Sequence, residues 1–249
     1  MRLLDRNITL LAHFVLDNIL PPILRDCKQI MYPIMRLAYG RETKLLLEFK
    51  EKFPFMKDAE LAEYYNCIVN VPVNIRRETD LNKTCLNWII KSINNAKGSV
   101  LDAACGRGYL LSKILESNPD VQCYGIDIVP PQEIHSICEN RAVVNREGMQ
   151  YKFQTADIMK LPFQDHSFDI VLCTHVLEHI RDPQKALKEL IRVSRQRLII
   201  VVPKQREYKY TVDFHVNFFP YLYSFKRFIG IENAVYLNLG GDFLCCIDF

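Results

Sequence analysis

From residue 99 onward, short apolar runs alternate with longer stretches of helical periodicity. The runs predict strands at 99–104, 121–127, 150–155, 168–174, 197–202, 234–239 and 243–249, and the stretches predict helices at 109–117, 131–145, 183–193 and 220–229. Strands that alternate with helices build a mainly parallel sheet. Only Gly240-Gly241-Asp242 joins the last two runs, which predicts an antiparallel hairpin. We therefore expect an α/β fold with a doubly wound, seven-stranded, mostly parallel sheet.

The chain changes character near residue 78. Before that point, apolar residues recur at helical spacing over 9–20, 42–53 and 58–69. We expect residues 1–78 to form a helical N-terminal cap or extension, and residues 79–249 to form the sheet domain, whose first helix Thr79 would cap. A peripheral membrane anchor is the alternative for the N-terminal helices, although their polar face is not rich in Lys and Arg.

Composition narrows the class of protein without naming a function. Hydrophobic residues make up 49% and charged residues 24% of the 249 residues, as in ordinary globular proteins. The net charge of +3 is too small to indicate nucleic-acid binding. The nine cysteines include no Cys-x-x-Cys pair, which argues against a zinc ribbon or a thioredoxin-like site, and several lie in apolar runs. We expect a cytoplasmic protein without a transmembrane segment.

The first predicted strand runs into a turn that contains two glycines. Asp102 and Cys105 precede Gly106-Arg107-Gly108, after which a helix begins. A glycine turn at a helix N-terminus lets a nucleotide-like ligand approach the backbone and its open N–H groups. A dinucleotide fingerprint needs a third glycine where Leu111 stands, so an NAD-linked reductase is disfavoured.

Two further carboxylates follow the next strands. Asp127 closes the second strand, 19 residues after Gly108, where a carboxylate can accept hydrogen bonds from both hydroxyls of a ribose. Asp157 follows the third strand and could accept from an adenine amino group, while Ile158 packs on the ring. Alone, each aspartate could equally be a helix cap or a turn residue. Together with the glycine turn they favour a nucleoside site.

These segments, with Val176-Leu177-Glu178-His179 after the fourth strand, resemble the class I S-adenosylmethionine-dependent methyltransferases. The resemblance covers residues 98–203 closely and 204–249 loosely. It implies S-adenosylmethionine as cofactor, with the methionine part near Asp102 and the turn, the ribose on Asp127, the adenine beside Ile128, Asp157 and Ile158, and the amino group on the Cys173 carbonyl. The implied cofactor-binding residues are Asp102, Ala104, Cys105, Gly106, Gly108, Asp127, Ile128, Asp157, Ile158 and Cys173. The family usually has glycine at Ala104, where we expect alanine to fit at negative φ.

Methyl transfer asks little of the protein, because the cofactor carries an activated methyl group. The chain must position the acceptor and, for a hydroxyl, supply a base. The candidate catalytic bases are His175, after the fourth strand, and His215, in a segment where the family often has His-x-x-Phe-Phe. Each histidine could instead be structural and satisfied by local hydrogen bonds. For His179 we prefer that structural role.

Two alternatives remain beside a methyltransferase that acts on a small molecule. His175, Glu178, His179 and His215 resemble the metal ligands of small-RNA 3′-terminal methyltransferases, although the first ligand there is Glu, and we expect no metal. No nucleic-acid-binding module accompanies the domain, so we expect a small-molecule partner and no nucleic acid. A degenerate domain that binds the cofactor and acts as a scaffold is the second hypothesis. The acceptor and the oligomeric state stay open.

Overall fold

The computed structural model describes residues 14–57, 60–61, 63–64, 67, 79–94, 96–128, 151–210 and 214–249. The chain divides into two compact units. The helical unit comprises Met1–Asp80 and Lys204–Pro220, and the sheet unit comprises Leu81–Pro203 and Tyr221–Phe249. The first boundary therefore falls two residues after the expected division at residue 78.

Residues 204–220 differ from the expected division, which assigned them to the sheet domain. Tyr208 and Phe214 are buried and join the apolar cluster of the helical unit. The ring of Phe214 lies 4.2 Å from that of Phe49, measured between centroids. Burial of these aromatic side chains among the helices explains why the segment belongs to the helical unit.

The helical unit is built from short elements. These are the π-helix η1 (Val15–Ile19), the α-helices α2 (Pro22–Arg25), α3 (Lys28–Tyr39) and α4 (Thr43–Lys52), and the 3-10 turns η2 (Gly40–Glu42) and η3 (Phe53–Phe55). α4 matches the helix expected at 42–53. The helix expected at 9–20 is described only from residue 14, and the one at 58–69 lies largely outside the described residues. α3 was not expected, because Pro33 reads as a helix breaker.

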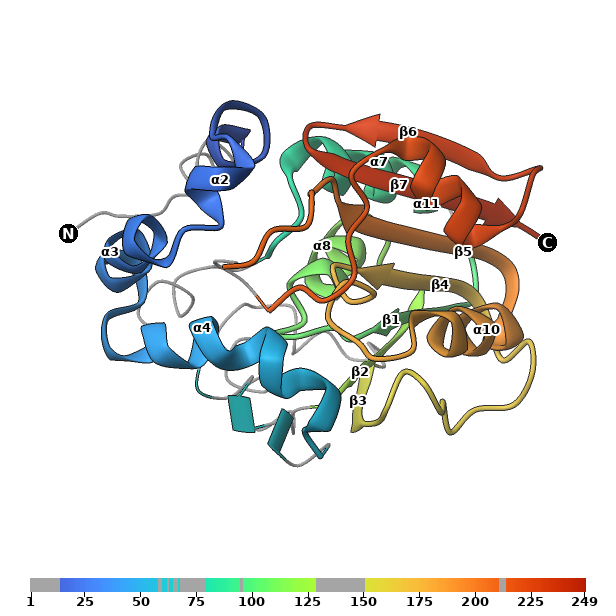
Figure 1. Ribbon diagram of the computed structural model, residues 1–249. Helices are drawn as coiled ribbons and strands as arrows, with labels where there is room; N and C mark the ends of the chain where they lie inside the picture. The colour runs from blue at the N-terminus through green and yellow to red at the C-terminus, as the bar shows by residue number, and fades with distance from the viewer. Residues whose placement is uncertain are drawn as a thin grey trace. The chain divides into compact units, whose positions relative to one another are not determined.

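The sheet unit contains one seven-stranded sheet in the order β3-β2-β1-β4-β5-β7-β6 (Figure 1). The strands are β1 (Ser99–Ala103), β2 (Gln122–Asp127), β3 (Tyr151–Thr155), β4 (Phe168–Thr174), β5 (Ser194–Pro203), β6 (Val235–Leu239) and β7 (Asp242–Asp248). β1 to β5 pair in parallel, and β7 runs antiparallel to both β5 and β6. The expected fold class and the terminal hairpin are confirmed.

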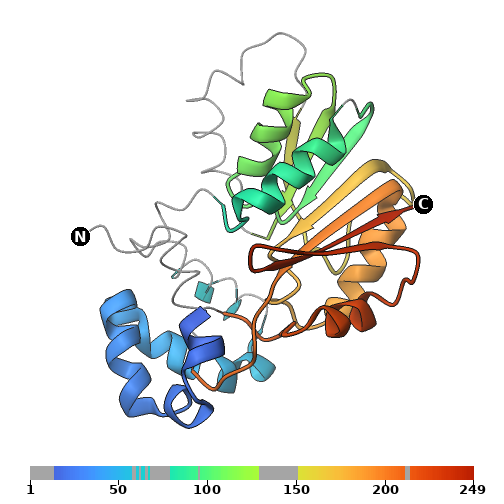
Figure 2. The same cartoon turned by 90° about the horizontal axis from the view of Figure 1, so that it is seen from above.

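Helices cover both faces of this sheet (Figures 1 and 2). α7 (Lys83–Ile93) and α8 (Tyr109–Ser117) lie on one face, and α10 (Pro183–Val193) and α11 (Leu222–Ile229) lie on the other. Asn82 caps α7 by accepting a hydrogen bond from the Cys85 amide, so Thr79 is not the cap, contrary to expectation. The helix expected at 131–145 lies outside the described residues.

Thiols contribute to the interior of the sheet unit. Of the eight described cysteines, six are buried there, namely Cys85, Cys105, Cys123, Cys173, Cys245 and Cys246. Burial raises the pKa of Cys123 to about 12 and that of Cys246 to about 11. Cys123 and Cys246 therefore stay protonated, and the six buried thiols pack as small apolar groups. Cys27 and Cys67, in the helical unit, are half-buried and exposed.

A buried polar cluster joins the end of β4 to the β6–β7 hairpin. His175 follows β4 with a φ of 55°, and its side chain is 9% exposed. Its Nε2 lies 3.4 Å from Asp242 Oδ2, and its Nδ1 lies 3.5 Å from Glu178 Oε1. Asn82 donates to Asp242 Oδ2 and to the Leu239 carbonyl, both at 2.7 Å. Burial lowers the pKa of His175, but the two carboxylates outweigh it and raise this pKa to about 10.

His175 should therefore make stability depend on pH. Its pKa is higher in the folded chain (about 10) than its ordinary value of 6.5, so its contribution is complete below pH 6.5 and is lost as pH rises toward 10. We expect His175→Asn to flatten the fall of the unfolding free energy over this range, by up to about 1.4 kcal/mol per pH unit. Asparagine tolerates the left-handed backbone, so the variant isolates the charge. Urea unfolding at several pH values measures the effect.

The matched control is His166→Asn. His166 also has a left-handed backbone, with a φ of 54°, but its ring bonds the Ser194 carbonyl and not a carboxylate. The control should keep the wild-type slope. Equal slopes in wild type and His175→Asn would contradict the assignment of a charged His175.

Candidate functional site

The turn between β1 and α8 has an unusual backbone. Ala104, Gly106 and Gly108 all lie in the left-handed region, with φ of 72°, 51° and 72°. The expectation that Ala104 sits at negative φ is therefore wrong. A left-handed conformation costs a residue with a Cβ about 1–2 kcal/mol, which explains why glycine is usual here. The turn is held by the Ile126 carbonyl, which accepts from the Ala104 and Cys105 amides, both at 2.8 Å.

The turn leaves room for a ligand at Gly106. A Cβ added at Gly106 would meet nothing within 4 Å, so the backbone faces open space there. Gly108 is the N-cap of α8 and offers no side chain to satisfy the first amides of that helix. A helix N-terminus that ends in a glycine turn suits close approach by a polar ligand.

Asp102, near the end of β1, carries the strongest indication of a missing partner. Its side chain is 2% exposed, and its Oδ1 has no hydrogen-bond partner among the described residues. Burial, and then the charge of Asp127, raise the pKa of Asp102 to about 7. A buried oxygen without a partner is costly, so this site favours a ligand that brings a donor or a positive charge. The α-ammonium group of a bound S-adenosylmethionine fits that requirement.

Asp127 ties the end of β2 to the turn. Its Oδ2 accepts a hydrogen bond from the Gly106 amide at 2.8 Å. The next residue, Ile128, is 43% exposed, which is high for a large aliphatic side chain. The structure therefore brings together a carboxylate, an open turn and an accessible apolar surface. These features suit a ribose and an adenine ring.

Asp157 and Ile158 follow β3. Asp157 Oδ1 accepts from the Met159 amide at 2.8 Å, which fixes the loop locally, and Ile158 is buried. The expected packing of Ile158 against an adenine ring would thus use a side chain that is 7% exposed before any ligand binds.

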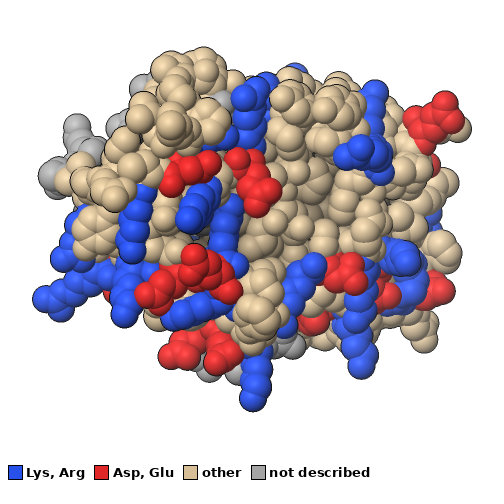
Figure 3. Space-filling model, in the orientation of Figure 1, with Lys and Arg blue, Asp and Glu red and all other residues tan. Residues whose placement is uncertain are grey.

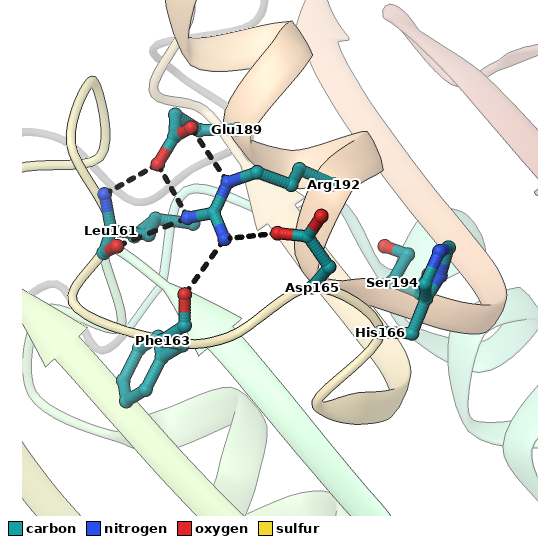
Figure 4. Close-up of polar contacts among 7 residues, drawn as sticks. All are labelled: Leu161, Phe163, Asp165, His166, Glu189, Arg192 and Ser194. Carbon is teal, nitrogen blue, oxygen red and sulfur yellow. Dashed lines mark hydrogen bonds and ion pairs between the residues drawn. The ribbon is translucent and has the colours of Figure 1, made fainter.

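Arg192 of α10 fastens the loop that continues from Asp157 (Figure 4). Its guanidinium pairs with both oxygens of Glu189, at 2.8 and 2.7 Å, and with Asp165 at 2.9 Å. It also donates to the carbonyls of Leu161 and Phe163, at 3.1 and 2.7 Å. Bidentate pairing of this kind gives geometric precision. Sequence reasoning missed Arg192, although its spacing of three residues from Glu189 on a predicted helix was a usable signal.

Two more residues of the site were missed. Gly125 in β2 allows close packing, because a Cβ there would lie 2.5 Å from the Phe153 ring and 2.7 Å from Cys105 Sγ. Asp242 lies 3.4 Å from His175, and only the fold brings these two residues together.

Cys173, which was predicted, is fully buried in β4, one residue before the strand ends. Its backbone is therefore at the carboxyl end of a central strand, where ligands of open α/β sheets bind.

The candidate histidines fall into different units. His175 and His179 belong to the sheet unit, and Glu178 Oε1 lies 3.9 Å from His179 Nε2. His215 belongs to the helical unit, where it is 7% exposed and its Nδ1 bonds Gln205 Oε1. Gln205 in turn donates to the Tyr208 hydroxyl at 3.1 Å. Since an amide oxygen can only accept, His215 donates to Gln205 from Nδ1.

Comparison with known proteins gives the site its context. Residues 101–202 match the family described as "Methyltransferase domain". Ajmaline N-methyltransferase of Rauvolfia serpentina is 31% identical over 42% of this chain and 35% of its own length. Tocopherol O-methyltransferase of Arabidopsis thaliana is 36% identical over 41% of this chain and 29% of its own length. The chain thus spans about a third of the length of these curated relatives.

A solved structure agrees with the fold. An S-adenosylmethionine-dependent methyltransferase from Aquifex aeolicus superposes with a TM-score of 0.52 over 78% of this chain and 98% of its own, at 14% sequence identity. The family match covers β1 to β5, with the turn, Asp127, Asp157 and Cys173. Residues 101–202 of this chain therefore match the methyltransferase-domain family, and they lie in a sheet with the fold of a solved S-adenosylmethionine-dependent methyltransferase.

Proposed function

We propose that this chain transfers the methyl group of S-adenosylmethionine to an oxygen or nitrogen atom of a small molecule. The observation that carries the proposal is the buried Asp102 oxygen, which lacks a partner among the described residues, beside a turn that is open at Gly106. The names of two relatives, an N-methyltransferase of ajmaline and an O-methyltransferase of tocopherol, support a small-molecule acceptor.

In this proposal, the chain's own residues bind and orient, and the cofactor, when bound, supplies a methyl group already activated on sulfur. Asp102, together with the Cys173 carbonyl, would hold the ammonium group, and Asp127 the ribose hydroxyls. Ile128, Asp157 and Ile158 would contact the adenine. The remaining contacts would come from the backbone of Ala104, Cys105, Gly106 and Gly108.

We assign the role of general base to His215. His175 would be a poor base, because its pKa near 10 keeps it protonated at neutral pH. His215 is the other candidate base, and it would accept the proton of an acceptor hydroxyl. We further propose that the protein acts in a reducing cytoplasm, without nucleic acid or metal. The free cysteines, six of them buried, support the reducing environment.

Calorimetric titration with S-adenosylmethionine, S-adenosylhomocysteine and NADH tests the cofactor. Binding of both adenosyl ligands but not of NADH is the expected result, and labelled methyl donor can then be used to screen acceptors. Binding without transfer to any acceptor would instead support a scaffold. No binding of the adenosyl ligands would contradict the proposal.

Asp127→Asn should weaken binding of S-adenosylhomocysteine by about 1.5–3 kcal/mol, because the ribose hydroxyls lose a charged acceptor. Titration calorimetry measures the change. Asp120→Asn is the matched control, since Asp120 is an exposed aspartate just before β2 and should bind the ligand like wild type. Unchanged affinity in Asp127→Asn would contradict the assignment of the ribose hydroxyls to Asp127.

Asp102 should link cofactor affinity to pH. Its pKa of about 7 means that ionisation accompanies binding of a cationic ligand. We expect the affinity for S-adenosylmethionine to rise between about pH 6 and 7.5, with release of a proton detectable in buffers of different ionisation enthalpy. Asp102→Asn should lose this dependence on pH. Titration of the ligand itself affects wild type and variant equally, so the difference between their pH profiles reports Asp102. The same pH profile in the variant would contradict the role of Asp102.

His215→Gln should slow methyl transfer to a hydroxyl acceptor by about 10²–10⁴-fold, because a general base is lost. The affinity for S-adenosylhomocysteine should remain as in wild type. Radiolabel transfer and calorimetry measure the two quantities, with His166→Gln as control. If transfer proceeds at the wild-type rate, His215 is a structural histidine held by Gln205.

A further inference from the structure

The helical unit exposes an unusual number of large apolar side chains. Of the 14 exposed large hydrophobic residues in the described part of the chain, eight lie within residues 14–37. They are Phe14 (55%), Val15 (36%), Ile19 (63%), Ile23 (81%), Leu24 (39%), Tyr32 (44%), Ile34 (46%) and Leu37 (72%). Single exposed hydrophobic residues are common, but a concentration in 24 successive residues marks a surface that something covers.

These exposed side chains are additional to those that α3 contributes to the core. α3 already supplies the core through Met31 and Met35, which are fully buried in the apolar cluster of the helical unit. Ile34 and Leu37 are three residues apart and therefore share a second face of the same helix, which is exposed. α3 thus has two apolar faces: the face with Met31 and Met35 is buried, and the face with Ile34 and Leu37 is exposed.

α2 packs next to α3 and adds the most exposed of the eight, Ile23. Figures 1 and 2 show the two helices side by side. In Figure 3, the surface over α2 is mostly tan, while charged side chains gather over α4. We call Ile23, Ile34 and Leu37 the apolar patch.

The charge around the apolar patch is positive. Between residue 22 and Glu48, which pairs with Lys44 at 3.8 Å, the chain carries five basic residues (Arg25, Lys28, Arg36, Arg41 and Lys44) and three acidic ones (Asp26, Glu42 and Glu48), a net charge of +2. All of the basic residues except Arg25 are exposed. Aliphatic side chains with exposed cations beside them match a membrane surface, where acyl chains lie beneath anionic headgroups. The core of a protein–protein interface is instead depleted of lysine.

We propose that the helical unit docks on an anionic lipid bilayer through the apolar patch, with the exposed Lys28 and Arg36 of α3 against the headgroups. Docking would be peripheral, since none of the helices in the described ranges has the length and apolar character needed to cross a membrane. The proposal is independent of the methyl acceptor and of the cofactor site in the sheet unit.

Co-sedimentation of the full chain with lipid vesicles tests the proposal. Vesicles of phosphatidylcholine with about 30% phosphatidylglycerol should bind the protein, and vesicles of phosphatidylcholine alone should bind it several-fold less. Leu37→Glu and Ile23→Glu should each lower the partition coefficient by about tenfold or more, because a charge replaces an inserted aliphatic group. Lys28→Gln should lower it about fivefold on anionic vesicles only.

Tyr223→Glu is the matched control. Tyr223 is 64% exposed, but it lies on α11 in the sheet unit, so this variant should sediment like wild type. Circular dichroism and binding of S-adenosylhomocysteine confirm that each variant is folded, and they keep failure here distinct from failure of the proposed function. Absence of binding to anionic vesicles, or wild-type binding by Leu37→Glu, would overturn the proposal. So would a dimer in solution that Leu37→Glu dissociates, since the patch would then pair two copies.

Discussion

The carbonyl of Ile126 determines where the turn between β1 and α8 can lie. It accepts from two successive amides, those of Ala104 and Cys105, so β2 holds the chain just beyond the end of β1. The chain then has to reverse before α8 begins, and it does so through left-handed residues at Ala104, Gly106 and Gly108. The open backbone at this turn is therefore a consequence of parallel pairing between two central strands.

The sheet and most of its helices could be predicted because their signals are local. Strands buried on both faces appear as continuous apolar runs, and α8 and α10 have the predicted bounds, each preceded by a glycine or aspartate. α3 escaped prediction because Pro33 suggests a break, whereas burial of Met31 and Met35 keeps the segment helical. Local propensity yields there to tertiary packing.

Prediction of the site was limited in the same way. The order of the turn, Asp127 and Asp157 is readable along the chain. The environment of His175 is not, because Asp242 lies 67 residues later and reaches it only when β7 pairs with β5. The left-handed backbone of Ala104 was also unreadable, since alanine is commonest at negative φ and only the hydrogen bonds to Ile126 impose the other conformation.

The distribution of the thiols has a practical consequence. Six cysteines of the sheet unit are buried and shielded from solvent, whereas Cys67 in the helical unit is exposed. A thiol-specific reagent under native conditions therefore modifies Cys67 before these six thiols, which it reaches only when the layers of the sheet unit separate. Mass spectrometry of the six buried thiols over time would therefore report the opening of the sheet unit, from residues the chain already contains.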